Sequence, residues 1–544
     1  MSALPVLRRT AGDRWCGTAP LLRAALRVER VRLLVWAVAV VGLTAMSVRS
    51  EQEAFASTEA RAARAELMRS PAATALAGPG YGLDDYTVGA MVANELSAWV
   101  ALALAVMSVL LVVRQLRGAE ESGLLELVRS APVGRHAPVL VAVAVVTAAD
   151  LGIGAALVLA LIVVGLPVAG AVAFGAGCAL VALTFGGVAA VAAQLVAHAR
   201  SASMLALAAI GLGMVLRGAG DVAAPESGSL LSWLSPFGWA QATRAWVDER
   251  WWPLALPVLA TVVCWLLAVA LAGRRDVGTG LLPERAGRTS ASVRLTGLAA
   301  LTARRQAGAF AGWTVGAATL CALVGVLARQ VVDFIDQEPA LAALFPSGSD
   351  GPAAAADAAL ARYLLVGACL AASAGVMGVV AVRAEEKSGR AAQVLAGPTA
   401  RTRWLLTQVG VVAGAATLVL ALGGLAMGLT AAASLDDAGL VGRLLAAALA
   451  QAPVVWFLIG LGVLLLGAVP RRTGMLWAYL GYVALTAMLA GLLPEGTDRL
   501  SPLRYTAALP AEPMDWWPVL LLAAAAAALT TVGTVAFRRR DLTD

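Results

Sequence analysis

The segment RGAEESGLLELVRSAPVGR at residues 117–135 returns in altered form as RAEEKSGRAAQVLAGPTAR at residues 383–401. Both copies fit the pattern R-x-x-E-x-S-G-x8-P-x-x-R at an offset of 266 residues. The matching positions are Arg117, Glu120, Ser122, Gly123, Pro132 and Arg135 in the first copy, and Arg383, Glu386, Ser388, Gly389, Pro398 and Arg401 in the second. Each copy lies between two long apolar runs, so this charged pair indicates a duplication inside a very apolar chain.

The composition around these segments is that of a membrane protein. The chain has 544 residues, of which 60% are hydrophobic and 14% charged, whereas soluble domains carry about 25% charged residues. Mean hydropathy is +0.81. The apolar runs are about 18–27 residues long and do not alternate, which is typical of membrane-spanning helices and not of strands. The sequence therefore predicts an all-α polytopic membrane protein.

The apolar runs divide into about twelve transmembrane helices. We expect them at residues 31–49, 96–113, 138–164, 170–196, 202–217, 253–272, 308–328, 362–382, 404–430, 443–469, 473–491 and 517–537.

Basic residues indicate how these helices are oriented. With the N-terminus inside the cell, 29 of the 41 lysines and arginines fall in cytoplasmic segments, as the positive-inside rule requires. This topology also explains the net charge of +7, so no nucleic-acid partner is expected. We predict a multi-pass protein of the bacterial plasma membrane with both termini in the cytoplasm.

Further matches extend the duplication over the whole chain. Leu234-Ser235-Pro236 matches Leu500-Ser501-Pro502, and Arg274-Arg275-Asp276 matches Arg539-Arg540-Asp541, at offsets of 266 and 265 residues. Each half carries six spans, an even number, so the halves form two parallel six-helix repeats related by an axis along the membrane normal. The predicted divisions are a first half at 1–272, a cytoplasmic linker at 273–300 and a second half at 301–544.

The chain contains no recognisable catalytic motif. A nucleotide-binding P-loop needs a lysine after a glycine, and the single lysine, Lys387, follows Glu386. No Ser/His/Asp arrangement and no Cys/His metal pattern is present. We therefore predict that the chain is not itself an enzyme and holds no cofactor.

The two charged segments are the strongest functional candidates. They can form short surface helices that dock on a soluble partner, or they can be solvated loops that only obey the positive-inside rule. The second interpretation explains the arginines but not the acidic pairs Glu120-Glu121 and Glu385-Glu386, so docking is favoured. The candidate docking residues are Arg117, Glu120, Glu121, Gly123, Glu126, Arg383, Glu385, Glu386 and Gly389.

Taken together, the twelve spans, the repeat and the charged loops resemble the permease subunit of an ABC-2-type (type V, exporter-like) ABC transporter. The double-length form is similar to actinobacterial permeases for polyketide antibiotics, including tetronasin exporters. The resemblance identifies Leu21–Arg32 with the connecting helix and residues 117–131 and 383–397 with coupling helices. It also assigns 230–250 and 493–515 to short helices at the outer face.

This resemblance implies an exporter of hydrophobic, drug-like small molecules. Two copies of a separate ATPase subunit, carrying Mg-ATP, would dock on the two loops. Spans 2 and 5 would line the substrate path. The residues that this places on the path are Trp99, Met107, Met204 and Met214. Asp150, midway along span 3, can be a proton site, a substrate contact or a locally paired structural group; we favour the last.

A proton-coupled secondary multidrug transporter with twelve spans is the main alternative. Its family usually carries G-x-x-x-D-R-x-G-R-R between spans 2 and 3, and neither loop here fits that pattern. A non-transporting scaffold is a third alternative, for which the sequence provides no positive sign.

Overall fold

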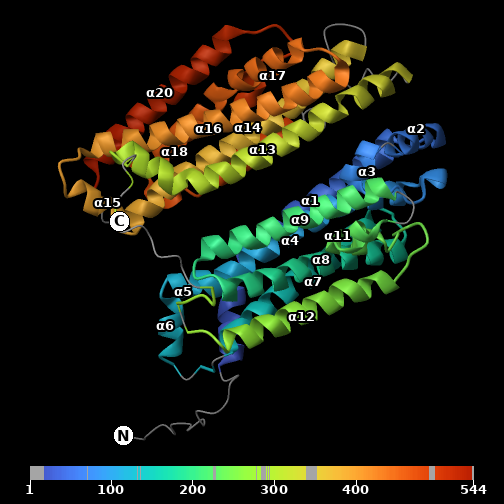
Figure 1. The fold of residues 1–544 in the computed structure, drawn as a ribbon, viewed down its shortest axis with the longest axis horizontal. Coiled ribbons are helices and arrows are strands. Elements are labelled where there is room, and N and C mark those ends of the chain that lie inside the picture. The colour runs from blue at the N-terminus through green and yellow to red at the C-terminus, as the bar shows by residue number, and fades with distance from the viewer. Residues whose placement is uncertain are drawn as a thin grey trace, which may run out of the picture. The chain divides into compact units, whose positions relative to one another are not determined.

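The computed structural model describes residues 17–69, 71–131, 133–134, 136–224, 228–276, 278–282, 290, 292, 295–337, 352–488 and 496–541. Within these ranges the regular structure is entirely helical. Contacts divide the chain into unit 1, Met1–Gly287, and unit 2, Arg288–Asp544. Both units are visible in Figure 1 as bundles of long helices.

Unit 1 contains the following helices in chain order: α1 (Thr18–Ala54), α2 (Thr58–Met68), α3 (Pro71–Ala77), η1 (Leu83–Asp85), α4 (Val88–Val113), η2 (Arg114–Gly118), α5 (Ala119–Glu121), α6 (Leu124–Arg129), α7 (Ala137–Val163), α8 (Val168–Leu195), α9 (Ala199–Ala223), α10 (Leu230–Trp233), α11 (Pro236–Gln241), η3 (Trp252–Leu254) and α12 (Ala255–Ala272). Of these, η2 is a π-helical turn and η1 and η3 are 3₁₀ turns.

Unit 2 contains α13 (Leu298–Gln337), α14 (Pro352–Lys387), α15 (Arg390–Leu395), α16 (Arg401–Leu435), α17 (Gly439–Ala450), α18 (Ala452–Ala468), η5 (Pro470–Arg472), α19 (Met475–Met488), η6 (Pro502–Tyr505) and α20 (Trp516–Arg539).

Eleven helices of the described residues are long and apolar enough to cross a membrane. The all-α polytopic fold is therefore confirmed. The span predicted at 473–491 differs, because its helix, α19, has only 14 residues in the described range. The span predicted at 443–469 is divided between α17 and α18 at Gln451. Pro453 explains this break, because proline removes a backbone donor and clashes with the preceding turn.

The long helices pack through very small residues. Gly154 of α7 and Gly175 of α8 face each other, and a Cβ on either would lie 3.1 or 2.8 Å from the other's carbonyl oxygen. In unit 2 a Cβ on Gly467 of α18 would lie 2.1 Å from the carbonyl oxygen of Gly533 in α20. Since lipid chains are as apolar as leucine, such close van der Waals packing holds membrane helices together.

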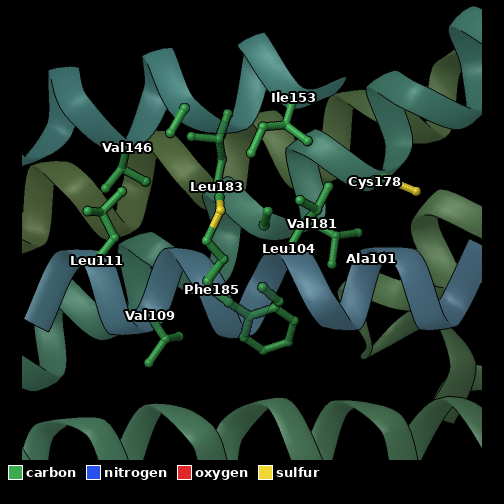
Figure 2. Close-up of a cluster of buried hydrophobic side chains, with 14 of the residues drawn as sticks. Ala101, Leu104, Val109, Leu111, Val146, Ile153, Cys178, Val181, Leu183 and Phe185 are labelled. Carbon is green, nitrogen blue, oxygen red and sulfur yellow. The ribbon is translucent and has the colours of Figure 1, made fainter. Parts of the chain in front are cut away.

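The core of unit 1 lies where α4, α7 and α8 meet. Figure 2 shows Leu104 and Leu111 of α4, Val146 of α7 and Leu183 of α8 directed into this space. All four side chains are buried. The core places the C-terminal end of α4, and with it the first charged segment, against the ends of α7 and α8.

A small helical layer lies at the end of unit 1 opposite α5 and α6 (Figure 1). It consists of α2 and α3, and the side chain of Ser57 caps α2 by accepting from the N–H of Ala60 at 3.1 Å. Arg64 of α2 pairs with Glu95 of α4 at 2.5 Å, and the Tyr86 hydroxyl also donates to Glu95, at 3.3 Å. Burial, and secondly the charge of Glu95, raises the pKa of Tyr86, which keeps its hydroxyl protonated as a donor.

The aromatic segments before the last helix of each unit differ. In unit 1 the expected short helices are present as α10 and α11, with Pro236 as the first residue of α11 and Ser235 as its cap. In unit 2 the described part of 493–515 holds the single 3₁₀ turn η6. Between α13 and α14, residues 338–351 lie outside the described residues.

Candidate functional site

Both charged segments follow the second long helix of their unit and turn at a glycine. In unit 1, α4 continues through η2 and α5, and Gly123 then adopts a φ of +72° before α6 begins. In unit 2, α14 runs to Lys387 and Gly389 adopts a φ of +75° before α15. A Cβ at either glycine would meet nothing within 4 Å, so the left-handed backbone and not a lack of space favours glycine.

Hydrogen bonds at these turns are those of a helix C-terminus. The N–H of Gly123 donates to the carbonyl of Glu120, and the N–H of Gly389 to that of Glu386, each at 3.0 Å. This is how a left-handed glycine closes a helix. The repeated Ser-Gly is therefore a helix stop, and the surface helices α6 and α15 have six residues each, shorter than the segments 117–131 and 383–397 suggested.

The first charged cluster consists of Arg117, Glu120 and Arg275. Arg117 lies 2.8 Å from Glu120, and Arg275, just beyond α12, donates to both carboxylate oxygens of Glu120. These side chains are 0%, 7% and 8% exposed. A carboxylate between two guanidinium groups has its charge compensated, which burial requires. The first segment is thus fastened to the end of α12.

Backbone groups complete this cluster. Arg117 donates through Nε to the carbonyl of Ala193 and through Nη2 to that of Thr279, the latter at 2.9 Å. Arg275 donates through Nε to the Gln194 side chain at 2.7 Å. The end of α8 and the chain that leaves α12 therefore converge on the same two arginines.

The second charged cluster repeats the arrangement with Arg383, Glu386 and Arg540. Arg383 lies 3.0 Å and Arg540 2.6 Å from the Glu386 carboxylate, which is 2% exposed. Arg540 directly follows α20, the last helix of unit 2. Arg401, the final position of the sequence pattern, donates to the carbonyl of Arg540 at 3.0 Å. The corresponding Arg135 of the first copy, and Pro132, lie outside the described residues.

A second ion pair in each unit joins the first long helix to the second, with the charges exchanged. In unit 1, Glu29 of α1 pairs with Arg114. In unit 2, Arg305 of α13 pairs with Glu385 at 2.7 Å. A glutamine supports each carboxylate, Gln115 on Glu29 and Gln408 on Glu385, both at 3.1 Å. Each charged segment is thus fixed to the first and the last long helix of its unit.

A known protein matches this chain over almost its full length. The family model for the C-terminal domain of the multidrug efflux system permease Rv1217c matches residues 295–538. The multidrug efflux system permease protein Rv1217c of Mycobacterium tuberculosis is 35% identical over 540 residues, which cover 98% of this chain and 96% of that protein. The chain belongs to this family of multidrug efflux system permeases. The predicted ABC-2-type permease is confirmed at the level of the family.

In this permease the predicted docking residues fall into two groups. Arg117, Glu120, Glu385 and Glu386 are buried or nearly so and are paired inside their own unit, and Arg383 is 14% exposed. Glu121 and Glu126 are exposed beside α6. Glu121 also accepts from the N–H of Ala199, the first residue of α9, at 2.8 Å. That any of them binds a partner stays a prediction.

The exposed faces of α6 and α15 have different chemistry. At an offset of 266, the exposed Glu121, Leu124, Glu126 and Leu127 of the first copy become Lys387, Arg390, Ala392 and Gln393 in the second, and all of these are exposed. The exposed face of the permease is therefore acidic and apolar where α5 turns into α6, and basic and polar where α14 turns into α15.

The residues predicted on the substrate path are not gathered together. Met107 is 2% exposed within the core of unit 1, and Met214 is half-buried against it. Trp99 of α4 and Met204 of α9 are exposed. Asp150 is buried, and the Ser108 hydroxyl lies 2.6 Å from both of its carboxylate oxygens, the kind of local pairing that the sequence favoured. Their roles stay predictions.

Sequence reasoning missed the partners that complete the two clusters. In the sequence, Arg275 and Arg540 served only as markers of the duplication. A charged residue repeated after the last span of each half could nevertheless have indicated that these arginines have a structural role. Sequence reasoning also missed Arg217 of α9, which is buried beside Asp221 and donates to the carbonyl of Leu76 at 2.9 Å. No three His, Cys, Asp or Glu side chains in the described ranges lie close enough to bind a metal ion.

Proposed function

We propose that this chain is the transmembrane subunit of an ATP-driven exporter that moves hydrophobic small molecules out of a bacterial cell. Separate ATPase subunits bind and hydrolyse Mg-ATP, and both chain termini lie in the cytoplasm. Units 1 and 2 are the two six-span repeats. The relative from Mycobacterium tuberculosis is a multidrug efflux system permease by name, which supports export of this class of compound.

The observation that carries the proposal is the pair of short helices α6 and α15. Each projects an exposed face from a turn whose buried side is fastened at two points, by the charged cluster and by the ion pair to the first helix. A rigidly held helix with an exposed apolar or charged face is suited to dock in a groove of a soluble partner. We assign ATPase docking to these exposed faces, and a supporting part to the buried residues.

Docking on two such helices implies two ATPase subunits, one for each unit. Two copies of one ATPase would present the same groove to an acidic, apolar helix and to a basic one. The two contacts then differ in affinity, because complementary charges that favour one helix disfavour the other.

The proposal is tested with the tagged chain co-expressed and purified together with ABC ATPases from its own genome. The complex is reconstituted in lipid vesicles, and accumulation of the hydrophobic dye rhodamine 6G is followed after Mg-ATP is added outside. We expect accumulation that needs ATP and the ATPase, and that persists with a protonophore. Dye transport by the chain alone that collapses with the protonophore would overturn the proposal in favour of a proton-coupled carrier.

A further inference from the structure

We propose that Arg275 and Arg540 are positioning residues that make the last long helix of each unit move together with the docking helix. This rests on the proposed function, and it adds a route by which ATPase movement enters the membrane part. The loop α5–α6 is covalently continuous with α4, and Arg275 ties it to α12 as well. In unit 2, Arg540 ties the last turn of α14, which leads directly into the turn before α15, to the end of α20.

The two ion pairs occupy corresponding places in their units, although Arg275 makes two hydrogen bonds to Glu120 and Arg540 makes one to Glu386. Arg275 and Glu120 are 155 residues apart in sequence, and Arg540 and Glu386 are 154 apart. In both cases the arginine approaches the carboxylate from the far end of the unit's chain, while a second arginine holds it from the preceding helical turn. The glutamate is thus shared between the docking loop and the last helix.

Stability alone does not account for these clusters. Apolar residues of similar volume often replace a buried ion pair without loss of stability, whereas an ion pair imposes a definite relative position. The two copies have also diverged at every exposed position of the docking face compared above, yet both keep the Arg–Glu–Arg cluster. The cluster was retained while most exposed positions changed, which points to a geometric requirement.

Membrane topology does not account for them either. The positive-inside rule needs basic residues near a helix end but does not specify their direction. Arg274 and Arg539 are exposed neighbours and satisfy that rule, whereas Arg275 and Arg540 turn inward, at 8% and 15% exposure. The chain therefore supplies a matched control next to each positioning residue.

The cluster of Arg117, Glu120 and Arg275 also holds the chain segment that follows α12. The Thr279 carbonyl accepts from Arg117 and also from Arg275, at 3.3 Å. Beyond it, the N–H groups of Leu281 and Leu282 donate to the carbonyls of Gln194 and Leu195, at 3.1 and 2.8 Å. The start of the segment that leads out of unit 1 is thus held against α8. We therefore expect Arg275→Gln to lower the amount of dye moved per ATP more than Arg540→Gln does.

The first experiment uses the complex with its ATPase in vesicles and compares R275Q, R540Q and the double variant with the controls R274Q and R539Q. We measure bound ATPase, ATP hydrolysis, and rhodamine 6G moved per ATP hydrolysed. We expect all variants to retain the ATPase and its basal hydrolysis. Dye moved per ATP should fall at least about fivefold in the double variant, a typical allosteric coupling, and remain near wild type in the controls. R275K with R540K should recover part of it.

A second measurement needs no variant of the clusters. Spin labels replace the exposed pair Ser122 and Arg274, or Ser388 and Arg539, in a chain whose cysteines are changed to serine. The dipolar spectrum of each pair should be the same without nucleotide and with ATP, because loop and helix move as one body. A separation that changes with ATP overturns the inference.

The remaining outcomes are also decisive. If the double variant transports as the two controls do, the positioning role is wrong while the proposed function stands. If the variants lose the ATPase itself, the arginines act in docking and not in transmission. If the wild-type complex moves no dye with ATP, the proposed function fails and this inference fails with it.

Discussion

Glu120 and Arg275 lie 155 residues apart in the sequence and share two hydrogen bonds in the interior of unit 1. Glu386 and Arg540 form the corresponding ion pair in unit 2, with one hydrogen bond, from Nη2 of Arg540, at 2.7 Å. The glutamates lie where the second long helix of each unit ends, before the glycine turn, and the arginines follow the last long helix. This relationship changes the meaning of the repeated motif, because its first arginine and its matched glutamate face inward in both copies.

Removal of the shared carboxylate should destabilise unit 1. Glu120→Ala leaves Arg117 and Arg275 buried without their counter-charge, at a cost of about 3–5 kcal/mol. Glu126→Ala, on the exposed face of α6, should change stability by less than about 0.5 kcal/mol. Thermal unfolding in detergent measures both. Equal melting temperatures for the two variants would contradict the buried cluster.

Docking should depend on the exposed face. Leu127 is 72% exposed on α6, and Leu127→Asp should lower the amount of ATPase that co-purifies by about tenfold or more, as for an interface hot spot, without a change in melting temperature. Leu230→Asp is the control, since Leu230 is 77% exposed on α10, which packs against α11 and not against α6. ATPase retained by the Leu127 variant would exclude α6 as a docking helix.

The two glycine turns should each need a left-handed residue. Gly123→Ala or Gly389→Ala should cost about 1 kcal/mol through backbone strain alone, since no atom lies near the added Cβ. Gly152→Ala is the control, because Gly152 of α7 has the same open surroundings in a helical backbone. A shift in melting temperature for Gly152→Ala as large as for the turn glycines would argue against this explanation.

Close packing in unit 2 should tolerate no methyl group between α18 and α20. Gly467→Ala pushes a Cβ against the backbone of Gly533 and should cost about 1–3 kcal/mol or more. Gly410→Ala in α16 adds the same methyl where nothing lies within 4 Å. The thermal stability of the purified variants separates the two cases, and a neutral Gly467→Ala would disprove the contact.

Asp150 distinguishes the two transport mechanisms. In Asp150→Asn the amide oxygen can still accept from the Ser108 hydroxyl, so a structural pair survives the change. We expect ATP-dependent dye transport to stay within about fivefold of wild type, since one neutral side-chain hydrogen bond contributes about 1 kcal/mol, which corresponds to that factor. Loss of transport with normal amounts in the membrane would instead favour a proton-carrying role.

Much of the fold was accessible without coordinates. Uninterrupted apolar runs predict helices because lipid offers the backbone no hydrogen-bond partners, and the long helices form where those runs lie. The lengths of the helices were less predictable. The helix α1 begins at Thr18 and ends at Ala54, well beyond 31–49. Hydropathy marks only the apolar part of such a helix, and its polar ends at a membrane surface carry no signal of this kind.

The sites were less accessible. A pattern in sequence marks Glu120 and Glu386 as special, but it does not say whether a carboxylate faces a partner or another part of its own chain. That depends on Arg275 and Arg540, whose distance along the sequence hides the contact. The reversed pairs Glu29–Arg114 and Arg305–Glu385 were invisible for a further reason, since opposite charges exchanged between helices leave no repeated residue type.

The sequence by itself determined that this chain is a helical membrane protein with two related halves and one charged loop in each. Those conclusions follow from hydropathy and repetition, which are local properties of the chain. Only the tertiary structure decided which charges are buried and which are available to a partner. Burial is a property of the packed helices, because a charge is neutralised by whatever the fold brings within a few ångströms of it, here residues about 155 positions away.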